Sequence, residues 1–395
     1  MNLHRVSSID VFRAFTMLCM IFVNDFWYLI DVPNWLLHAR GEDFIGFSDY
    51  VFPAFLFAVG LSIPFAIENR FAKGDSHMKI AFHISLRTFS LIVMGLFLVN
   101  HFFYFGTSMV GLSRSVSWIL MVTGFFLIWN MYPKSNGWKK YLFIALQFIG
   151  VGLLIFLFVV FRDRSGNMME VHWWGVLAQI GWAYFPCALI YLVIRNRLPV
   201  MVISLLAFIL FRMGRSVISQ WLDFLYVYIP GGHIPGDGAF HCFTMSGIIV
   251  SLLCIRYGSP DKVKKLFAIL ISAVVVFKLA DVVTYNWWNY SFDDNTPPFI
   301  FTCLSASVLL YVLLYWLTDI KGKKHWFNII KPAGVATLTC YLLPDVFYSL
   351  FRIFSIEFPD VIRTYPLGLL KSLTFALIIT WITALLGKLN VTLKI

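Results

Sequence analysis

The sequence predicts an all-α fold: a polytopic helical membrane protein with about twelve (11–12) transmembrane helices. Of its 395 residues, 60% are hydrophobic and 18% aromatic, whereas only 13% are charged. An ordinary soluble domain carries about twice that share of charged residues. Apolar stretches of about 17–25 residues, the length that crosses a bilayer, recur from one end of the chain to the other.

The predicted spans follow one another with short connections, and no soluble insert separates them. We therefore expect a single integral-membrane domain over residues 1–395. The seventh span is short and is expected to tilt or to re-enter the membrane. The spans are expected near residues 10–29, 50–67, 81–104, 115–132, 141–161, 173–194, 199–213, 239–255, 266–285, 298–317, 332–351 and 367–387.

The orientation follows from the basic residues, because cytoplasmic loops of membrane proteins are enriched in Lys and Arg. Here most of the Lys and Arg lie in alternate loops, which predicts that both termini are cytoplasmic. The loop that carries His38 then faces outward. The same face receives residues 212–238, rich in Gly and Pro, and residues 285–298, which we call the aromatic loop.

Several function classes lack support in the sequence. The net charge of +11 reflects membrane topology, so we expect no nucleic-acid partner. The six cysteines show no C-x-x-C spacing, which argues against a zinc site and a disulfide framework. Neither G-x-S-x-G, nor a Walker A sequence, nor H-E-x-x-H occurs. The first residues lack the features of a signal peptide, so the first span is expected to be retained.

Residues 5–68, which we call the core hairpin, combine two apolar spans with an unusual number of polar side chains. A polar group inside hydrocarbon costs several kcal/mol, so such a cluster indicates a functional site. The remaining spans are expected to frame this hairpin. The polar side chains of this hairpin that we single out are Asp10, Arg13, Asn24, His38 and Asp49.

His38 lies in the loop between these two spans and is either a solvated loop residue or a catalytic one. A histidine held by a carboxylate is suited to general base catalysis near neutral pH. Asp49, at the start of the next helix, is a candidate partner, but Glu42 and Asp43 are equally placed by spacing. Asn24 either bonds to another helix or donates to a carbonyl oxygen that gains charge.

Asp10 and Arg13 are three residues apart and share one face of the first span. They form either a local ion pair, with Ser7 or Ser8 as the helix cap, or a site where Arg13 meets a phosphate-bearing ligand from the cytoplasm. Arg87, one or two turns inside the third span, is expected to join such a site.

The spacing of two further groups of polar residues suggests that their members interact. Lys278 and Asp281 are three apart and are expected to neutralise each other. His233, Asp237 and His241 have a spacing that resembles a metal motif, but the intervening prolines and glycines argue against one helix presenting all three, and we predict no metal. In the aromatic loop, Trp287, Trp288 and Tyr290 form either an interfacial belt or a stacking platform for a sugar ring.

The core hairpin resembles a known family. Its segments R-x-x-S-I-D-x-F-R, M-x-x-x-F-V-N, H-A and S-D-x-V-F-P-x-F-L-F-x-V-G are similar to those of the heparan-α-glucosaminide N-acetyltransferase family of transmembrane acyltransferases. The segment M-x-x-x-W-W-G-V-L-x-x-I-G-W-A-Y resembles the bacterial branch, some of whose members are labelled N-acetylglucosamine-related transporters. After the histidine this chain reads H-A-R-G-E-D, where the family has H-A-x-W-N-G.

The resemblance implies an enzyme that moves an acetyl group from cytoplasmic acetyl-CoA to an amino sugar or glycan on the outer face, N-acetylation being favoured over O-acetylation. It assigns the family's active histidine to His38, its asparagine to Asn24 and its aspartate to Asp49. The phosphates of acetyl-CoA are then expected near Arg13, with Asp10 and Arg87.

An amino-sugar or N-acetylglucosamine permease is the alternative function, although the sequence shows no inverted repeats. A purely structural subunit leaves the polar residues of the spans without a task. The expected partners are the acceptor sugar and membrane lipids, with a homodimer as one option. The expected location is a bacterial inner membrane.

Overall fold

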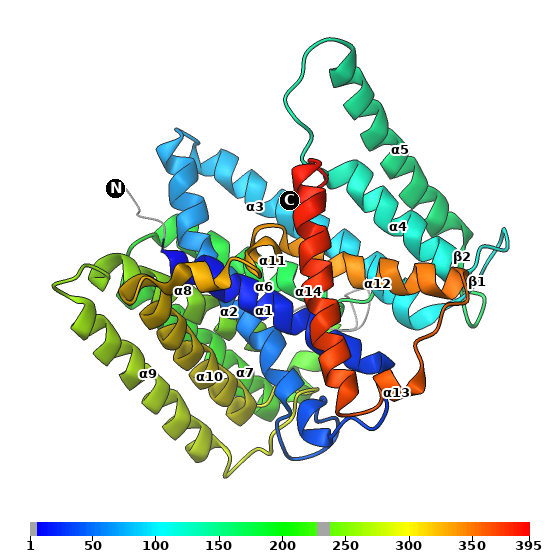
Figure 1. The fold of residues 1–395 in the computed structure, drawn as a ribbon. Helices are drawn as coiled ribbons and strands as arrows, with labels where there is room; N and C mark the ends of the chain where they lie inside the picture. The colour runs from blue at the N-terminus through cyan, green and yellow to red at the C-terminus, as the bar shows by residue number, and fades with distance from the viewer. Residues whose placement is uncertain (1–5, 227–237) are drawn as a thin grey trace.

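Helices form nearly all of the regular structure in the computed structural model, which describes residues 6–226 and 238–395, with side chains omitted for 215–226 (Figure 1). The α-helices are α1 (Ser7–Asn24), α2 (Phe47–Ala72), α3 (His77–Val99), α4 (Arg114–Trp129), α5 (Trp138–Val160), α6 (Val176–Ile194), α7 (Leu198–Tyr226), α8 (Ala239–Tyr257), α9 (Val263–Thr284), α10 (Pro297–Tyr315), α11 (Lys331–Val335), α12 (Thr337–Ile353), α13 (Asp360–Arg363) and α14 (Leu367–Lys388). Short 3₁₀ or π turns are η1 (Asp25–Tyr28), η2 (Asn34–Leu36), η3 (Asn100–Tyr104), η4 (Trp316–Ile320) and η5 (Lys323–Phe327). Strands β1 (Phe105–Ser108) and β2 (Phe161–Asp163) pair antiparallel.

The helical membrane fold is confirmed at the level of class. Every predicted span overlaps a helix, and eight helices in the described part of the chain are long and apolar enough to cross a membrane. Helix α4 and the first part of α7 are apolar but shorter. The count of twelve spans and the cytoplasmic side of both termini stay predictions. The small β1–β2 ribbon is an addition that the all-α prediction did not contain.

The seventh apolar span is short, as predicted, but the loop expected after it is wrong in its first part. Helix α7 is 29 residues long and continues to Tyr226, well into the segment 212–238 that was expected to be a loop. Gly214 lies inside this helix, where a single glycine costs only about 1 kcal/mol, and apolar residues continue at helical spacing beyond it. Residues 227–237 lie outside the described part of the chain.

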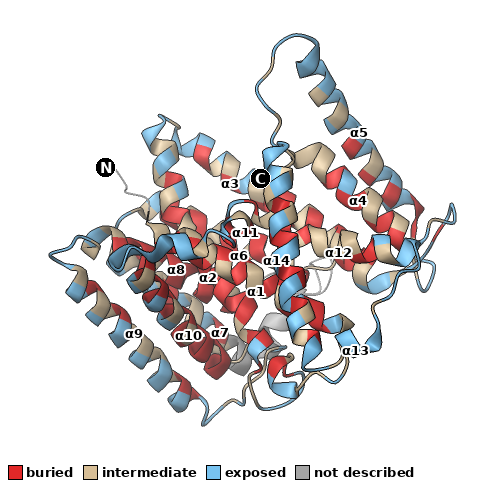
Figure 2. Ribbon diagram, viewed as in Figure 1, coloured by how far each residue is buried: buried red, intermediate tan, exposed pale blue. Residues whose placement is uncertain are grey.

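Burial separates central helices from peripheral ones (Figure 2). The most apolar stretches of α2 and α8 are 72% and 83% buried, whereas those of α9 and α5 are only 17% and 22% buried. Figure 1 shows α9 and α5 at the edges of the molecule, where their exposed apolar side chains suit contact with lipid. The core hairpin is therefore surrounded by other helices, as expected.

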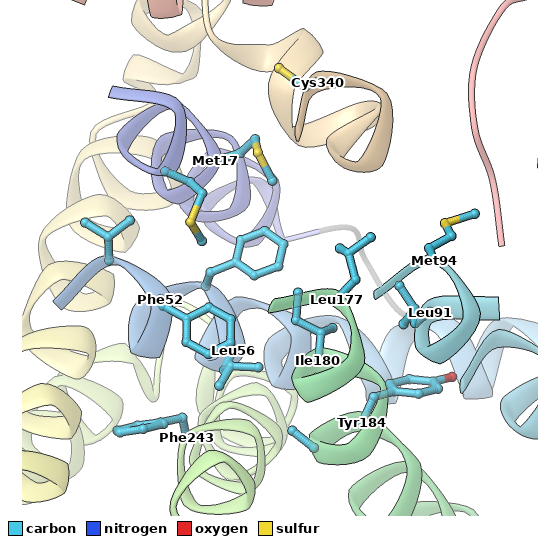
Figure 3. Packing of buried hydrophobic residues seen from close by; sticks show 14 of the residues in the cluster. Met17, Phe52, Leu56, Leu91, Met94, Leu177, Ile180, Tyr184, Phe243 and Cys340 are labelled. Carbon is cyan, nitrogen blue, oxygen red and sulfur yellow. The ribbon is translucent and has the colours of Figure 1, made fainter. Parts of the chain in front are cut away.

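The hydrophobic core lies where α1, α2, α3 and α6 meet. Figure 3 shows Met17 of α1 above Phe52 and Leu56 of α2, with Leu177 and Ile180 of α6 beside them. The N-terminus of α1 is fixed from a distant segment: Asp319 accepts hydrogen bonds from the backbone N–H groups of two serines there. The expected cap by Ser7 or Ser8 side chains is thus wrong, because a carboxylate from η4 takes that place.

Helices α2 and α8 approach each other through two glycines. A Cβ atom on Gly60 would lie 1.9 Å from the carbonyl oxygen of Thr244, and one on Gly247 would lie 2.1 Å from that of Phe57. Small residues allow helix backbones to come this close, and the gain is dispersion attraction along the contact. This contact places α2, which carries Asp49, against a helix whose most apolar stretch is 83% buried.

We expect the substitution Gly247→Ala to destabilise the protein by about 1–3 kcal/mol or more, because the new methyl group overlaps backbone atoms that cannot move aside. Thermal unfolding in detergent measures this as a lower midpoint. Gly152→Ala is the matched control, since a Cβ there meets nothing within 4 Å. Equal midpoints for the two variants would contradict the role of the α2–α8 contact.

Candidate active site

His38 and Asp49 form a hydrogen-bonded pair between the loop and α2. The His38 Nδ1 atom lies 2.6 Å from Asp49 Oδ1; Asp49 is fully buried, whereas the His38 side chain keeps 27% of its surface exposed. When Nδ1–H donates to the carboxylate, Nε2 carries the lone pair. The pair therefore presents a base with a fixed ring orientation, and among the three candidates Asp49 is the partner.

The loop is folded around the second oxygen of the same carboxylate. Asp49 Oδ2 accepts hydrogen bonds from the backbone N–H groups of Ala39, at 3.1 Å, and Gly46, at 2.9 Å. Ser48 Oγ donates to the Leu36 carbonyl at 2.5 Å. Gly46 must lack a side chain, because a Cβ there would lie 1.8 Å from the Leu37 carbonyl oxygen. These contacts hold His38 at the N-terminus of α2.

The aromatic loop covers the histidine. The Phe292 ring packs on the His38 ring, with centroids 4.6 Å apart. Asp43 accepts hydrogen bonds from the Tyr285 hydroxyl and the Tyr290 backbone N–H, both at 2.7 Å. Asp43 thus ties the aromatic loop to the His38 loop.

A buried carboxylate, paired with a more exposed lysine, holds the other side of the aromatic loop. Lys278 Nζ lies 2.5 Å from Asp281, as predicted, and Tyr290 donates its hydroxyl proton to the same carboxylate at 2.9 Å. Burial, with the hydrogen bond to Asp281, raises the pKa of Tyr290 to about 12. The phenol is therefore protonated at neutral pH and remains a donor.

His38 lines a cavity of about 740 Å³, which we call the His38 cavity. This size is within the usual range for small-molecule sites. Asn24 lines it as well, and in the described part of the chain no residue hydrogen-bonds to the Asn24 side chain. The interhelical role considered for Asn24 is thus not seen. Trp287 and Trp288 do not line this cavity; Trp27 and Trp174 do.

Arg13, Asp10 and Arg87 line a second cavity of about 870 Å³, which we call the Arg13 cavity. The predicted ion pair exists, with Arg13 Nη2 3.3 Å from Asp10 Oδ1. The Arg87 guanidinium lies over the Tyr184 ring, 4.9 Å from its centroid. Glu68 also lines this cavity, but its charge is neutralised by Arg195 at 2.5 Å.

The two cavities meet. Their linings share Met20 of α1, Val176 and Leu177 of α6, and Tyr341 of α12. Helix α1 contributes Arg13 to one cavity and Asn24 to the other, which corresponds to about 16 Å along the helix axis. The same helices thus line both the cavity with the two arginines and the cavity with the histidine.

Two acidic residues of this region were missed by the sequence analysis. Asp25, directly after Asn24, is buried and accepts hydrogen bonds from Tyr348, Ser372 and, at 2.8 Å, Lys371. Asp345 of α12 lines the His38 cavity. Lys371 and Asp345 were detectable, because each is an ionisable residue inside a predicted span.

Of the three residues in the metal-like spacing, His241 lies in the described part of the chain. His241 is buried in α8, and its ring stacks on Phe208 with centroids 4.9 Å apart. His233 and Asp237 lie outside the described residues. Within the described ranges, no group of three His, Cys, Asp or Glu side chains is arranged to hold a metal ion.

Comparison with curated proteins shows a distant relationship. The chain is 32% identical over 100 residues to the human heparan-alpha-glucosaminide N-acetyltransferase, and this match covers 24% of the chain and 14% of the human protein. The mouse protein of the same name is 31% identical over 101 residues, again 14% of its length. The chain therefore matches only a small part of these relatives. No model of a known protein family matches the chain.

We expect Asp25→Ala to destabilise the protein by about 3–5 kcal/mol, because the buried Lys371 ammonium loses its counterion. The measurement is thermal unfolding in detergent. Asp360→Ala, which removes an exposed ion pair with Arg363, is the control and should change little. Adding Lys371→Met to Asp25→Ala should restore much of the loss; no rescue would mean that the charge pair is not the cause.

Proposed function

We propose that this protein is an acetyltransferase that takes acetyl from acetyl-CoA in the Arg13 cavity and passes it to an amino sugar or glycan in the His38 cavity. One observation carries the proposal: a cavity with two guanidinium groups and a cavity with a His–Asp pair lie on the same helices and share four residues. The distant similarity to N-acetyltransferases supports the same reaction.

The Arg13 cavity has the chemistry that the donor requires. Guanidinium groups match phosphate oxygens with a planar set of donors, so Arg13 and Arg87 suit the phosphates of CoA. Asp10 holds Arg13 in place through their ion pair. The long pantetheine arm then runs along α1 past Met20 and Leu177, which brings the thioester to the His38 cavity.

In the His38 cavity, His38 Nε2 serves as the general base. In the direct route it takes a proton from the acceptor amine while the nitrogen attacks the thioester carbonyl, and the C–S bond then breaks to release CoA. In the two-step route the imidazole itself carries the acetyl group before the acceptor arrives. In both routes the Asn24 amide donates to the carbonyl oxygen as charge develops on it, and Asp49 stabilises the charged imidazole.

A permease for amino sugars is the second candidate, because a path along several helices also suits transport. The two functions differ in their need for a base. Uptake of labelled sugar into liposomes that is independent of acetyl-CoA and survives His38→Ala supports the permease. The proposed acetyltransferase predicts neither result.

We expect His38→Ala to lower acetyl transfer from radiolabelled acetyl-CoA to glucosamine by about 10²–10⁴-fold, the usual loss of a general base. The assay uses purified protein in detergent or liposomes. His325→Ala, at an exposed histidine on η5, is the control and should retain activity. Equal activity of both variants would remove His38 from the reaction.

We expect Arg13→Ala and Arg87→Ala to raise the KM for acetyl-CoA about tenfold or more with a smaller effect on kcat, because each removes a charged contact to phosphate made before and during the reaction. Arg256→Ala removes an exposed arginine outside both cavities and should leave the KM unchanged. An unchanged KM in both cavity variants would contradict the assignment of the donor site.

A further inference from the structure

Asp345 is a carboxylate on α12 that lines the His38 cavity without a partner in the described chain. No hydrogen bond or ion pair reaches it from any described residue. The other buried or half-buried acids of the membrane region have close partners: Asp25 has Lys371, Asp281 has Lys278, and Glu68 has Arg195. Since an unpaired charge away from water is costly, Asp345 stands out.

The two nearest arginines are committed to other groups. Arg352 and Arg114 attract the Asp345 carboxylate electrostatically from a distance. Arg352 donates to the Tyr28 hydroxyl at 3.0 Å, and Arg114 donates to the carbonyl oxygens of His101 and Phe102. These two arginines lower the cost of the charge on Asp345 but leave its oxygens available as acceptors.

The rest of the lining suits a sugar ring. Trp27 and Trp174 place exposed aromatic surface on the cavity, which packs against the apolar face of a pyranose. Amide side chains suited to sugar hydroxyls come from Asn24, Gln179 and Asn295. The cavity thus combines the unpaired Asp345 carboxylate with aromatic and neutral polar groups, while Asp293 and Arg40 are further charged residues of its lining.

We propose that Asp345 is a specificity-determining residue that binds the protonated amino group of an amino sugar in the His38 cavity. A carboxylate and an ammonium form a charge-assisted hydrogen bond, which a hydroxyl at the same position of the sugar replaces only in part. The inference deepens the proposed function, on which it rests for the identity of the acceptor. It concerns binding, before any proton or acetyl transfer.

The test compares glucosamine with glucose, which differ by an amino group in place of a hydroxyl. Affinities are measured by titration calorimetry on the full chain in lipid nanodiscs, with wild type and three variants. Asp345→Asn removes the charge with little change of shape. Asp293→Asn changes the other unpaired acid of the same cavity, and Asp360→Asn changes an exposed acid outside it.

We expect wild type to bind glucosamine about tenfold or more tightly than glucose, the usual size of a charge-assisted contact. Asp345→Asn should reduce this ratio to about one while the affinity for glucose stays within about twofold, and Asp360→Asn should behave as wild type. The proposal is overturned if wild type shows no preference, or if the preference survives Asp345→Asn, including the case where Asp293→Asn abolishes it.

The binding assay separates this inference from the acetyltransferase proposal, because it requires no turnover. A preference that depends on Asp345 in a protein that transfers no acetyl group would retain the amino-sugar site and reject the transferase. Acetyl transfer to glucosamine with equal affinities for glucosamine and glucose would retain the transferase and reject the amino-sugar site at Asp345. Circular dichroism and thermal unfolding of Asp345→Asn confirm that the variant is folded.

Discussion

The buried carboxylate of Asp49 is the group on which the candidate site depends. Inside a membrane protein such a charge needs donors around it, and it has three: the His38 ring and the backbone N–H groups of Ala39 and Gly46. Each of these donors lies in the loop before α2. The three hydrogen bonds to the Asp49 carboxylate therefore fix the loop conformation at the N-terminus of α2. They also orient the His38 ring.

Helix packing places this local arrangement beside the Arg13 cavity. The glycine contact holds α2 against α8, while α1, α6 and α12 line both cavities and meet at Met20, Leu177 and Tyr341. Because α1 extends along both cavities, the same face of this helix places Arg13 in the Arg13 cavity and Asn24 in the His38 cavity. The site thus depends mainly on long helices, while His38, the aromatic loop, Trp27 and Trp174 come from the segments between them.

Much of the fold and of the candidate site could be predicted from the sequence. The physical reasons for this also explain which predictions failed. Hydropathy located the helices because helix length is tied to bilayer thickness, yet it ended the seventh span at residue 213, whereas α7 continues to Tyr226. The pattern of residue types pointed to His38, Asn24 and Arg13, but spacing left Asp49, Glu42 and Asp43 equal, since the loop conformation decides among them. Asp345 was not singled out because whether a charge has a partner depends on helices far apart in the sequence.

The distribution of charge within the fold separates structural from functional groups. Pairs such as Asp25–Lys371 and Lys278–Asp281 are satisfied internally and fix one segment to another, so each acts as a permanent contact. An ionisable group that faces a cavity without such a partner stabilises nothing in the folded chain and costs free energy until a ligand arrives. Selection for stability alone removes such a group. We therefore relate Asp345 in the His38 cavity to the charge of the ligand that it meets, and likewise the Arg87 guanidinium, for which the described part of the chain supplies the Tyr184 ring but no acidic partner.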